Sequence, residues 1–483
     1  MCSTWQDETT PPAVRSGRAT AGVDLSTGAS QPTVASGPAV AMNRNDRAIT
    51  GFAMAGHGLV HTYELAVPIL LTVWLVEFSV TSATLGTVVA VGYGLFGVGA
   101  LPAGILVDRF GSRVLIVACT LGMGVSFLLL ALLPGVAGIA VALAVWGVAA
   151  SVYHPAGLTL ISKGVEERGA AFAYHGMAGN AGIVAGPFLT ALLLLAVEWR
   201  VAVAILAVPA LVAGLVGSRV EFDEVAAVTT TDGGGASEME GGDSPATDGG
   251  DAPATDVGSL REFVTASRGV FTLGFLTVFG LVMFNGLYYR GMLTFLPGLL
   301  SDFLAPLVGS AGAGSDGIGP VSEGPVAGEF DLSRYLYTGL LAVGIGGQYV
   351  GGRLTDAIDP ERGVAVMLAA LTAIALLFVP ASGTLPALLA VSVALGFALF
   401  AMQPLTQATI AKYSPPEHRG LSFGYTYLAI FGIGALGASV TGAALTYGST
   451  NTLFLLLAVF SALGLALAVS LVVRDRRAGS EDR

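Results

Sequence analysis

Residues Gly104–Arg113 read GILVDRFGSR, and a shortened version of this stretch, GRLTD, stands at Gly352–Asp356. Further matches follow both stretches in the same order and at nearly the same separation: Pro155 with Pro404, Lys163 with Lys412, and Arg168-Gly169 with Arg419-Gly420. One match could arise by chance, but an ordered series indicates that the two halves of the chain are copies of one unit. The repeat therefore predicts two homologous bundles with a transport path between them.

The composition places these bundles in lipid. Of the 483 residues, 54% are hydrophobic and only 11% charged, and the mean hydropathy is +0.76; charged residues make up about 25% of ordinary soluble domains. This balance excludes a soluble globular enzyme, a disordered protein and a nucleic-acid-binding protein. Lipid accepts only helices and closed barrels, because an unpaired backbone amide is costly there. The apolar runs are long and do not alternate with polar residues, which favours helices.

The apolar stretches suffice for about twelve spans, at roughly 20 apolar residues for each helix plus a short turn. The fold predicted is an all-α polytopic membrane protein in which twelve transmembrane helices form two pseudo-symmetric six-helix bundles. The predicted spans are 48–76, 83–106, 114–133, 137–162, 168–196 and 200–219 in the first half, and 269–300, 334–354, 363–380, 385–412, 420–447 and 452–473 in the second.

Polar stretches set the predicted domain boundaries. They are a disordered tail at 1–47, the first bundle at 48–220, an acidic disordered linker at 221–262, the second bundle at 263–474 with an outer loop at 301–332, and a tail at 475–483. Basic residues gather in one alternating set of connections, including Arg113, Lys163 and Arg362. By the positive-inside rule, both termini of this multi-pass cell-membrane protein are then cytoplasmic.

The formal net charge is −11, and many of the acidic residues stand in the two long polar stretches. Acid-rich loops with few lysines favour a salt-loving source, because acidic surfaces stay solvated there. The two cysteines, Cys2 and Cys119, predict no disulfide framework. Residues 1–47 lack the apolar core of a cleavable signal peptide. Met42 heads the sequence MNRNDR and is a candidate start, which would leave residues 1–41 untranslated.

The opening stretch resembles the cytoplasmic signature of the major facilitator superfamily, which implies that family's fold and a transport function. In that family such contacts latch one of two access states. A glycine there would let helices approach closely, and Asp108 could cap a helix N-terminus or pair with an arginine. The residues that match the gating signature are Gly104, Asp108, Arg109, Gly111 and Arg113, with Gly352 and Asp356 in the second half.

Within that superfamily, two segments resemble the fosmidomycin-resistance type of exporter. The first is GHGLVHTYELAVPILL in span one, and the second runs from SVYHPAGL to the glycine-rich fifth span. Ala156 stands where that group commonly carries an acidic residue after His-Pro. The fifth span also resembles the antiporter motif of the family and allows close helix packing, through Gly179, Gly182, Gly186 and Pro187.

Ionisable groups inside a span are costly and therefore mark candidate functional sites. His57, His61 and Glu64 stand at i, i+4 and i+7, on one face of the first span and beside Tyr63. Because histidine titrates near neutral pH, this face predicts a proton relay or a substrate contact. Two alternatives are a structural polar cluster and a zinc site formed by the two histidines and the glutamate.

Other polar residues are predicted to line the same cavity. Asn285 and Arg290 stand in span seven, the repeat partner of span one. Arg290 either extends toward the membrane interface, pairs with Glu64, or holds an anionic substrate. His154, His175, Gln403 and Gln407 are expected to line the path, with hydrogen bonding between helices as the alternative.

The function predicted is that of a secondary active transporter that exports a small, drug-like compound in exchange for protons. No GxxxxGK[ST] loop for ATP is present, and we expect no cofactor and no enzymatic activity. Its expected partners are the substrate, a coupling ion and the bilayer, with no nucleic acid, and the chain is expected to be a monomer. Alternatives are a symporter of an organic anion and an intramembrane metalloenzyme or sensor at His57, His61 and Glu64.

Overall fold

The computed structural model describes residues 42–228, 260–312 and 331–481, which fall within one compact unit that begins at Met42. The predicted N-terminal tail up to residue 41, linker residues 229–259 and loop residues 313–330 lie outside the described residues. Every regular element within those ranges is a helix and none is a strand, which confirms the predicted all-α class.

The first half of the chain folds into helices whose bounds follow the predicted spans closely. They are α1 (Arg44–Glu77), α2 (Ser82–Phe110), α3 (Ser112–Leu132), α4 (Gly135–Ser151), α5 (Tyr153–Gly164), α6 (Arg168–Ala196) and α7 (Trp199–Gly217).

The second half begins with a short helix and then repeats the arrangement. Its elements are α9 (Leu260–Val270), α10 (Leu273–Gly312), α11 (Leu332–Ala357), α12 (Pro360–Ala381), α13 (Leu385–Tyr413), the 3-10 turn η1 (Pro416–His418), α14 (Arg419–Tyr427), the π-helix η2 (Leu428–Ile433), α15 (Leu436–Tyr447) and α16 (Thr450–Glu481).

Among the described residues, 11 helical segments are long and apolar enough to cross a membrane, with α4–α5 and α14–α15 each forming one segment. The remaining predicted span, 334–354, corresponds to α11, which has 26 residues. Its length is sufficient to cross a membrane. Its composition, and not its length, therefore keeps it out of the 11 apolar segments. Arg334, Gln348, Arg353 and Asp356 make it the most polar of the predicted spans.

The helices differ from the predicted spans in several places. α10 continues to Gly312, into the stretch predicted as an outer loop, because Phe303, Leu304 and Leu307 still pack on the core. α16 continues to Glu481, through most of the predicted tail, where Asp475 pairs with Lys412. The predicted span 137–162 divides at Val152 into α4 and α5.

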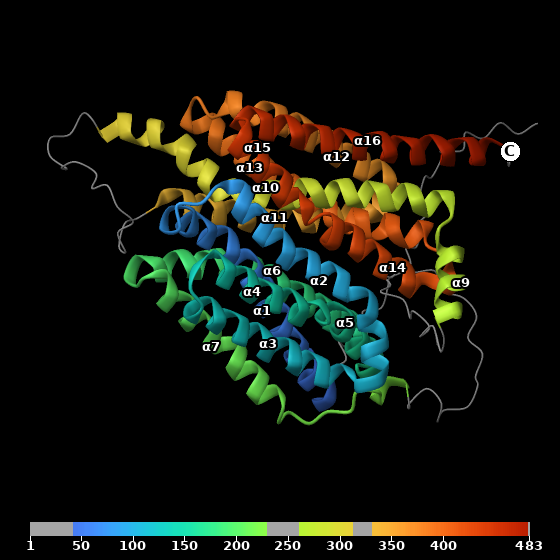
Figure 1. Cartoon of the computed structure of the whole chain (residues 1–483). Coiled ribbons are helices and arrows are strands. Elements are labelled where there is room, and N and C mark those ends of the chain that lie inside the picture. The colour runs from blue at the N-terminus through green and yellow to red at the C-terminus, as the bar shows by residue number, and fades with distance from the viewer. Residues whose placement is uncertain (1–41, 229–259, 313–330, 482–483) are drawn as a thin grey trace, which may run out of the picture. The chain divides into compact units, whose positions relative to one another are not determined.

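Helix packing repeats between the halves. In the first half α1 packs on α6, α2 on α4 and α3 on α7; in the second, α10 packs on α15, α11 on α13 and α12 on α16. These are the corresponding helices of the two copies, so the repeat read from sequence is a repeat in space. The halves meet along three symmetric pairs, α2 with α15, α6 with α11, and α1 with α10 (Figure 1, blue to green against yellow to red).

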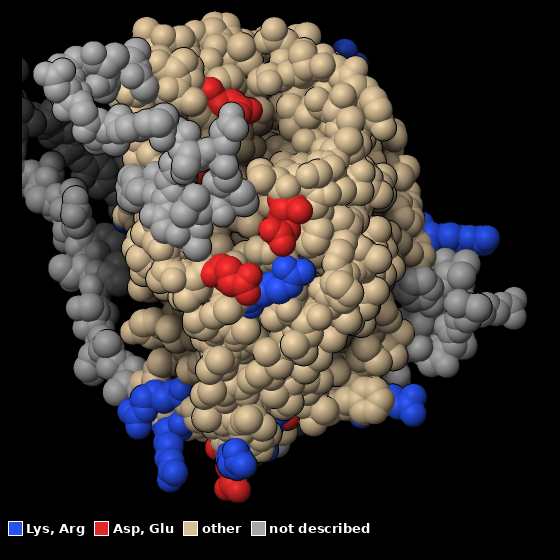
Figure 2. Space-filling model, turned by 60° about the vertical axis from the view of Figure 1, so that its left-hand side comes forward, with Lys and Arg blue, Asp and Glu red and all other residues tan. Residues whose placement is uncertain are grey.

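The outer surface is apolar. Many large hydrophobic side chains are exposed on the helices, with Leu132 at 76% and Tyr447 at 83%. In the face seen in Figure 2, charged side chains occupy a few patches and leave wide areas without charge. Such exposure would be unfavourable in water and suits contact with lipid tails.

The helices alternate in direction, so α2 ends, and α1 and α3 begin, at one end of the bundle; we call it the Asp108 end. α16 also ends there, which brings both described chain termini to the same end. At the opposite end the halves touch: the Ala83 amide donates to Thr446 Oγ1 at 2.9 Å, and the rings of Phe188 and Tyr335 lie 6.4 Å apart.

Candidate functional site

Four of the five histidines in the chain gather at the centre of the helix bundle, on three different helices. His57 and His61 come from α1, His154 from α5 and His175 from α6. The rings of His57 and His175 stack with centroids 3.9 Å apart, and the His154 ring lies 5.3 Å from His57 and 5.6 Å from His61. The structure thus brings His154 and His175 to His57 and His61, which were predicted to share one face of the first span.

Local sequence explains how these rings come together. The spacing of His57, His61 and Glu64 places all three on one face of α1. The helix breaks at Val152, just before Pro155, because proline has no amide hydrogen to donate to the Ser151 carbonyl. On α6, Gly179 faces the imidazole of His57: a Cβ there would lie 2.7 Å from His57 Nδ1. Only glycine leaves room for this ring.

A chain of hydrogen bonds runs along this polar face and crosses into the second half. His57 Nδ1 lies 2.7 Å from the backbone oxygen of His175, and His57 Nε2 lies 3.1 Å from His61 Nε2. His61 Nδ1 lies 2.7 Å from Glu64 Oε2. The other carboxylate oxygen of Glu64 accepts from Arg290 Nη2 of α10. Glu64 and Arg290 are 2% and 3% exposed, so a buried ion pair joins the two halves.

Burial of Arg290 excludes one of its three predicted alternatives. The guanidinium does not extend to the membrane interface: it lies 3.9 Å above the Tyr93 ring, and the rings of Tyr289 and Phe431 lie 5.6 and 5.5 Å away. Aromatic faces stabilise a cation that has left water. Arg290 Nε is buried without a hydrogen-bond partner.

Two tyrosines belong to the site although the sequence prediction did not include them. The Tyr93 hydroxyl donates to the Glu64 backbone oxygen at 2.8 Å. The Tyr153 hydroxyl donates to the backbone oxygen of Ala53 and lies 3.2 Å from His175 Nε2. Tyr93 stands alone in a long apolar run, where no periodic polar pattern marks it. The position of Tyr153 beside His154 was its only signal.

Several predicted residues lie elsewhere. Tyr63 donates to the Leu206 backbone oxygen of α7 at 2.6 Å, so in this structure its hydroxyl bonds to α7 and not to the histidine cluster. Gln407 is exposed, and Gln403 accepts from Gln348 Nε2 of α11 at 3.4 Å. Asn285 is half-buried on α10.

The glycine-rich face of α6 packs directly on α1. A Cβ at Gly182 would collide with the Gly58 backbone, and one at Gly186 would collide with Thr62. Pro187 is buried inside the same helix. The predicted close packing is therefore present and holds the histidine-bearing faces of α1 and α6 together.

The gating signature lies at the Asp108 end. Asp108 pairs with Lys163 Nζ at 3.7 Å, and both side chains are about half exposed. In this structure Glu224, not Asp108, accepts from the Ser112 amide at 2.8 Å and caps α3. Gly111 has φ 81°, a conformation that glycine adopts readily.

The remaining signature residues have few contacts. A Cβ at Gly104 or Gly352 would meet open space, so neither glycine is a point of close helix approach in this structure. Arg113 Nη2 donates to the Ser218 backbone oxygen at 2.8 Å, and Arg109 lies over the Phe110 ring. Asp356 is exposed.

Among the described residues, one group could approach a metal ion together: His57, His61 and His154, with ring nitrogens within 4.8 Å of one another. Nitrogen ligands of tetrahedral zinc lie about 3.3 Å apart, given Zn–N distances near 2.0 Å. The set is wider than that, and Glu64 is engaged by His61 and Arg290. The arrangement matches a hydrogen-bonded cluster better than the predicted zinc alternative.

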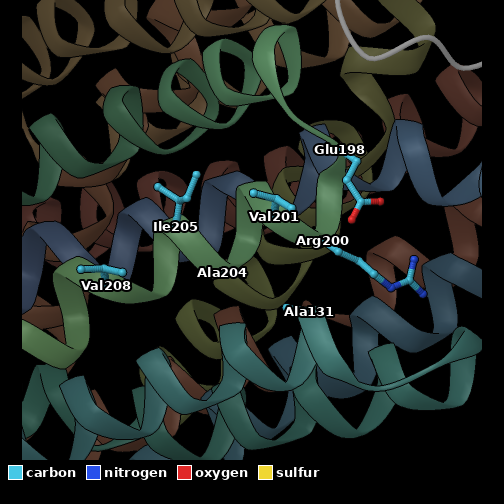
Figure 3. Close-up of a pocket in the computed structure, with 7 residues that line it drawn as sticks. All are labelled: Ala131, Glu198, Arg200, Val201, Ala204, Ile205 and Val208. Carbon is cyan, nitrogen blue, oxygen red and sulfur yellow. The ribbon is translucent and has the colours of Figure 1, made fainter.

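Two open grooves of about 460 Å³ lie away from the ion pair. Figure 3 shows one along α7, lined by Ala131, Glu198, Arg200, Val201, Ala204, Ile205 and Val208. Exposed valines and Ile205 make this groove part of the lipid-facing surface. The other follows the seam of α1 and α6 past Gly58 and Gly182.

Comparisons with known proteins bear on the fold. The sequence matches the family described as Major Facilitator Superfamily over residues 49–315 and 304–483. No curated protein sequence matches the chain. Among solved structures, a bacterial homolog to the human lysosomal transporter Spinster, inward-facing and unoccupied, is similar with a TM-score of 0.64 and 13% identity, over 89% of this chain and 98% of that one.

Two further solved structures are similar. The same homolog in its occupied, inward-facing conformation has a TM-score of 0.61 and 14% identity, over 90% of this chain and 98% of that one. A mutant of the nucleoside transporter NupG has a TM-score of 0.61 and 13% identity, over 89% of this chain and 99% of that one. At such identities the likeness concerns the fold, and it confirms the predicted arrangement. The resemblance to fosmidomycin-resistance exporters stays a prediction.

Proposed function

Because the chain belongs to the major facilitator superfamily, we propose that it is a secondary active transporter that exports a small organic compound in exchange for protons. Its two halves would rock about the central site and open it to each side of the membrane in turn. We place the protein in the cell membrane as a monomer, with the Asp108 end and both termini in the cytoplasm. The observation that carries the proposal is the buried ion pair between Glu64 and Arg290.

This ion pair links protonation to the contact between the halves. Removing one partner of a buried ion pair typically costs about 3–5 kcal/mol, because the other charge is left uncompensated. The pair therefore separates only when something replaces one of the charges. His61 can gain or lose a proton and is in hydrogen-bond contact with the same carboxylate, so the protonation of this contact changes the charge that holds the pair. Binding of a proton is in this way coupled to movement of α1 against α10.

The contacts at the two ends of the bundle support a state that is open at the Asp108 end. At the opposite end the halves touch through Ala83 and Thr446, and through Phe188 and Tyr335. Toward the Asp108 end α2 still contacts α14, with Leu101 beside Gly424, and beyond this contact Gly104 and Gly352 face open space. We propose that these glycines become packed, and that Asp108 changes partners, when the transporter opens to the other side.

Transport by purified protein in proteoliposomes tests the proposal. Compounds selected in a susceptibility screen of overexpressing cells would be offered at an imposed proton gradient. We expect substrate and protons to move in opposite directions, and Glu64→Gln to abolish gradient-driven transport. Arg200→Gln is a matched control, because Arg200 also pairs with a glutamate but is 30% exposed. Gradient-driven transport that persists in Glu64→Gln, or that never responds to the proton gradient, contradicts the proposal.

One observation favours a second candidate, proton-coupled symport of an organic anion. Arg290 Nε is buried with no hydrogen-bond partner. A buried donor that makes no hydrogen bond lowers the stability of the fold. When Glu64 is protonated, the guanidinium is free to bind a carboxylate or phosphonate in its place. Vesicles loaded with substrate distinguish the two: a proton gradient that drives the compound along with the protons, rather than against them, favours symport.

A further inference from the structure

Three consecutive hydrogen bonds link the polar face of α1. They join His57 Nδ1 to the His175 backbone oxygen, His57 Nε2 to His61 Nε2, and His61 Nδ1 to Glu64 Oε2, at 2.7, 3.1 and 2.7 Å. Atoms at these separations are within hydrogen-bond distance, and each such bond requires one hydrogen atom between the two heavy atoms. The three links therefore need three hydrogens.

The side chains in their ordinary states supply only two. A neutral imidazole carries one ring hydrogen, and an ionised carboxylate carries none. The backbone oxygen of His175 cannot donate, so the hydrogen of His57 is on Nδ1, which leaves its Nε2 as an acceptor. If His61 then donates from Nε2, its Nδ1 faces an ionised carboxylate with a lone pair. If it donates from Nδ1, two ring lone pairs face each other at 3.1 Å.

We infer that the structure is the proton-loaded form of the transporter, with one excess proton held by His57, His61 and Glu64. Arg290 lies on the other oxygen of Glu64 and favours the ionised carboxylate. The excess proton therefore rests mainly on the two imidazoles, as a charged Nε2–H···Nε2 bond. That this proton is the coupling ion rests on the function proposed above.

The surroundings hold the imidazole pair in this arrangement. The single hydroxyl hydrogen of Tyr153 goes to Ala53, so its oxygen accepts from His175 Nε2 and fixes the hydrogen of that ring. His61 is the partner that can exchange a proton, since its side chain is 15% exposed. The titratable and charged groups around the pair are Glu64 of α1, Tyr93 of α2, Tyr153 and His154 of α5, His175 of α6, Arg290 of α10, and Tyr427, whose ring lies beside His154.

Loss of the excess proton breaks the chain at a defined place. The N–H bond of one imidazole breaks and its proton leaves, and either the His57–His61 link or the His61–Glu64 link then lacks a hydrogen. In both cases the carboxylate that pairs with Arg290 loses the positive charge of the imidazole pair beside it, and in the second case it also loses its hydrogen bond to His61. Deprotonation thus acts on the ion pair between the halves without requiring that Glu64 itself be ionised anew.

Ring-nitrogen NMR of full-length protein, labelled with 15N-histidine and reconstituted in lipid, tests this count. Only five histidines contribute. At about pH 6 we expect one doubly protonated ring shared by His57 and His61, with a hydrogen bond between the two Nε2 atoms. The signal should vanish in His57→Gln and in His61→Gln and persist in His418→Gln. The wild-type spectrum decides the count even if a variant fails to fold.

Two results overturn the inference. One is a spectrum in which both rings are neutral while the Glu64 carboxyl, observed by 13C, is ionised. The other is stoichiometric transition metal in the purified protein, whose removal shifts the signals of both rings. This readout requires no transport, so the proton-loaded state can be established even if proton-driven export fails. Conversely, gradient-driven transport that is unchanged in His61→Gln removes the excess proton from coupling.

Discussion

Glu64 of α1 and Arg290 of α10 form a buried ion pair between equivalent helices of the two halves. Their helices are the first of each repeat, so the pair joins the two copies directly. Any rocking of one half against the other must move these two side chains relative to each other. A single proton at this place can therefore bias the conformation of the whole transporter.

Separate removal of the two charges should destabilise the protein more than their joint removal. We expect Glu64→Gln or Arg290→Gln to lower the free energy of unfolding by about 3–5 kcal/mol, because each leaves a buried charge unpaired. The double variant should recover most of this loss. Thermal unfolding in detergent measures the cycle, and additive losses would show that the pair contributes nothing as a pair.

The seam of α1 and α6 should tolerate a methyl group at one glycine and not at another. Gly182→Ala places a Cβ against the Gly58 backbone, whereas Gly176→Ala meets open space. We expect the first to cost about 1–3 kcal/mol through overpacking, and the second to be neutral or slightly stabilising, because alanine favours a helix. Equal melting temperatures for the two variants would contradict the packing described.

The cap on α3 should depend on Glu224. Gly111 precedes this helix and has no side chain to cap it, and Glu224 accepts from the amides of Ser112 and Arg113 at 2.8 and 3.3 Å. We expect Glu224→Ala to destabilise the protein by about 0.5–2 kcal/mol, and Glu221→Ala, an exposed acid nearby, to have no effect. Equal unfolding temperatures for Glu224→Ala and Glu221→Ala would contradict this prediction.

Opening of the bundle at the end opposite Asp108 should be necessary for transport. Ala83 and Thr446 are in contact there, so cysteines at both positions should cross-link with a short thiol reagent. The native Cys119 is buried, and Cys2 would be replaced by serine. We expect cross-linking to stop transport and reduction of a cleavable linker to restore it. Full transport by the cross-linked protein would exclude movement at this end.

The sequence predicted the helices well and the contacts only in part. Apolar length marked each span, because crossing the bilayer takes roughly 20 apolar residues, and the repeat showed which spans of the two halves correspond. Internal features left weaker signals: the π-helix at Leu428–Ile433 and the divided span at Val152 depend on local backbone bonding. α10 passes its predicted end because Leu304 and Leu307 keep helical spacing on the core.

Site residues were predictable where charge in a lipid-spanning segment is rare. His57, His61 and Glu64 stood out for that reason, and pairing with Arg290 was one of three alternatives. Tyr63 and Gln407 carry the same polar signal, yet one bonds to α7 and the other is exposed. Which face of a helix meets the centre depends on packing between helices, and adjacent residues such as Tyr63 and Glu64 point to different neighbours.

Distance measurements between spin labels test the central claim most directly, since they require no known substrate. Ile105 of α2 and Tyr349 of α11 are 56% and 65% exposed near the Asp108 end and belong to different halves. With cysteine labels at both, the separation should be longer at about pH 5 than at about pH 9, because protons favour the state that is open at this end. In Glu64→Gln it should not respond to pH. A separation that never changes with pH, or that changes equally in Glu64→Gln, would contradict coupling through this ion pair.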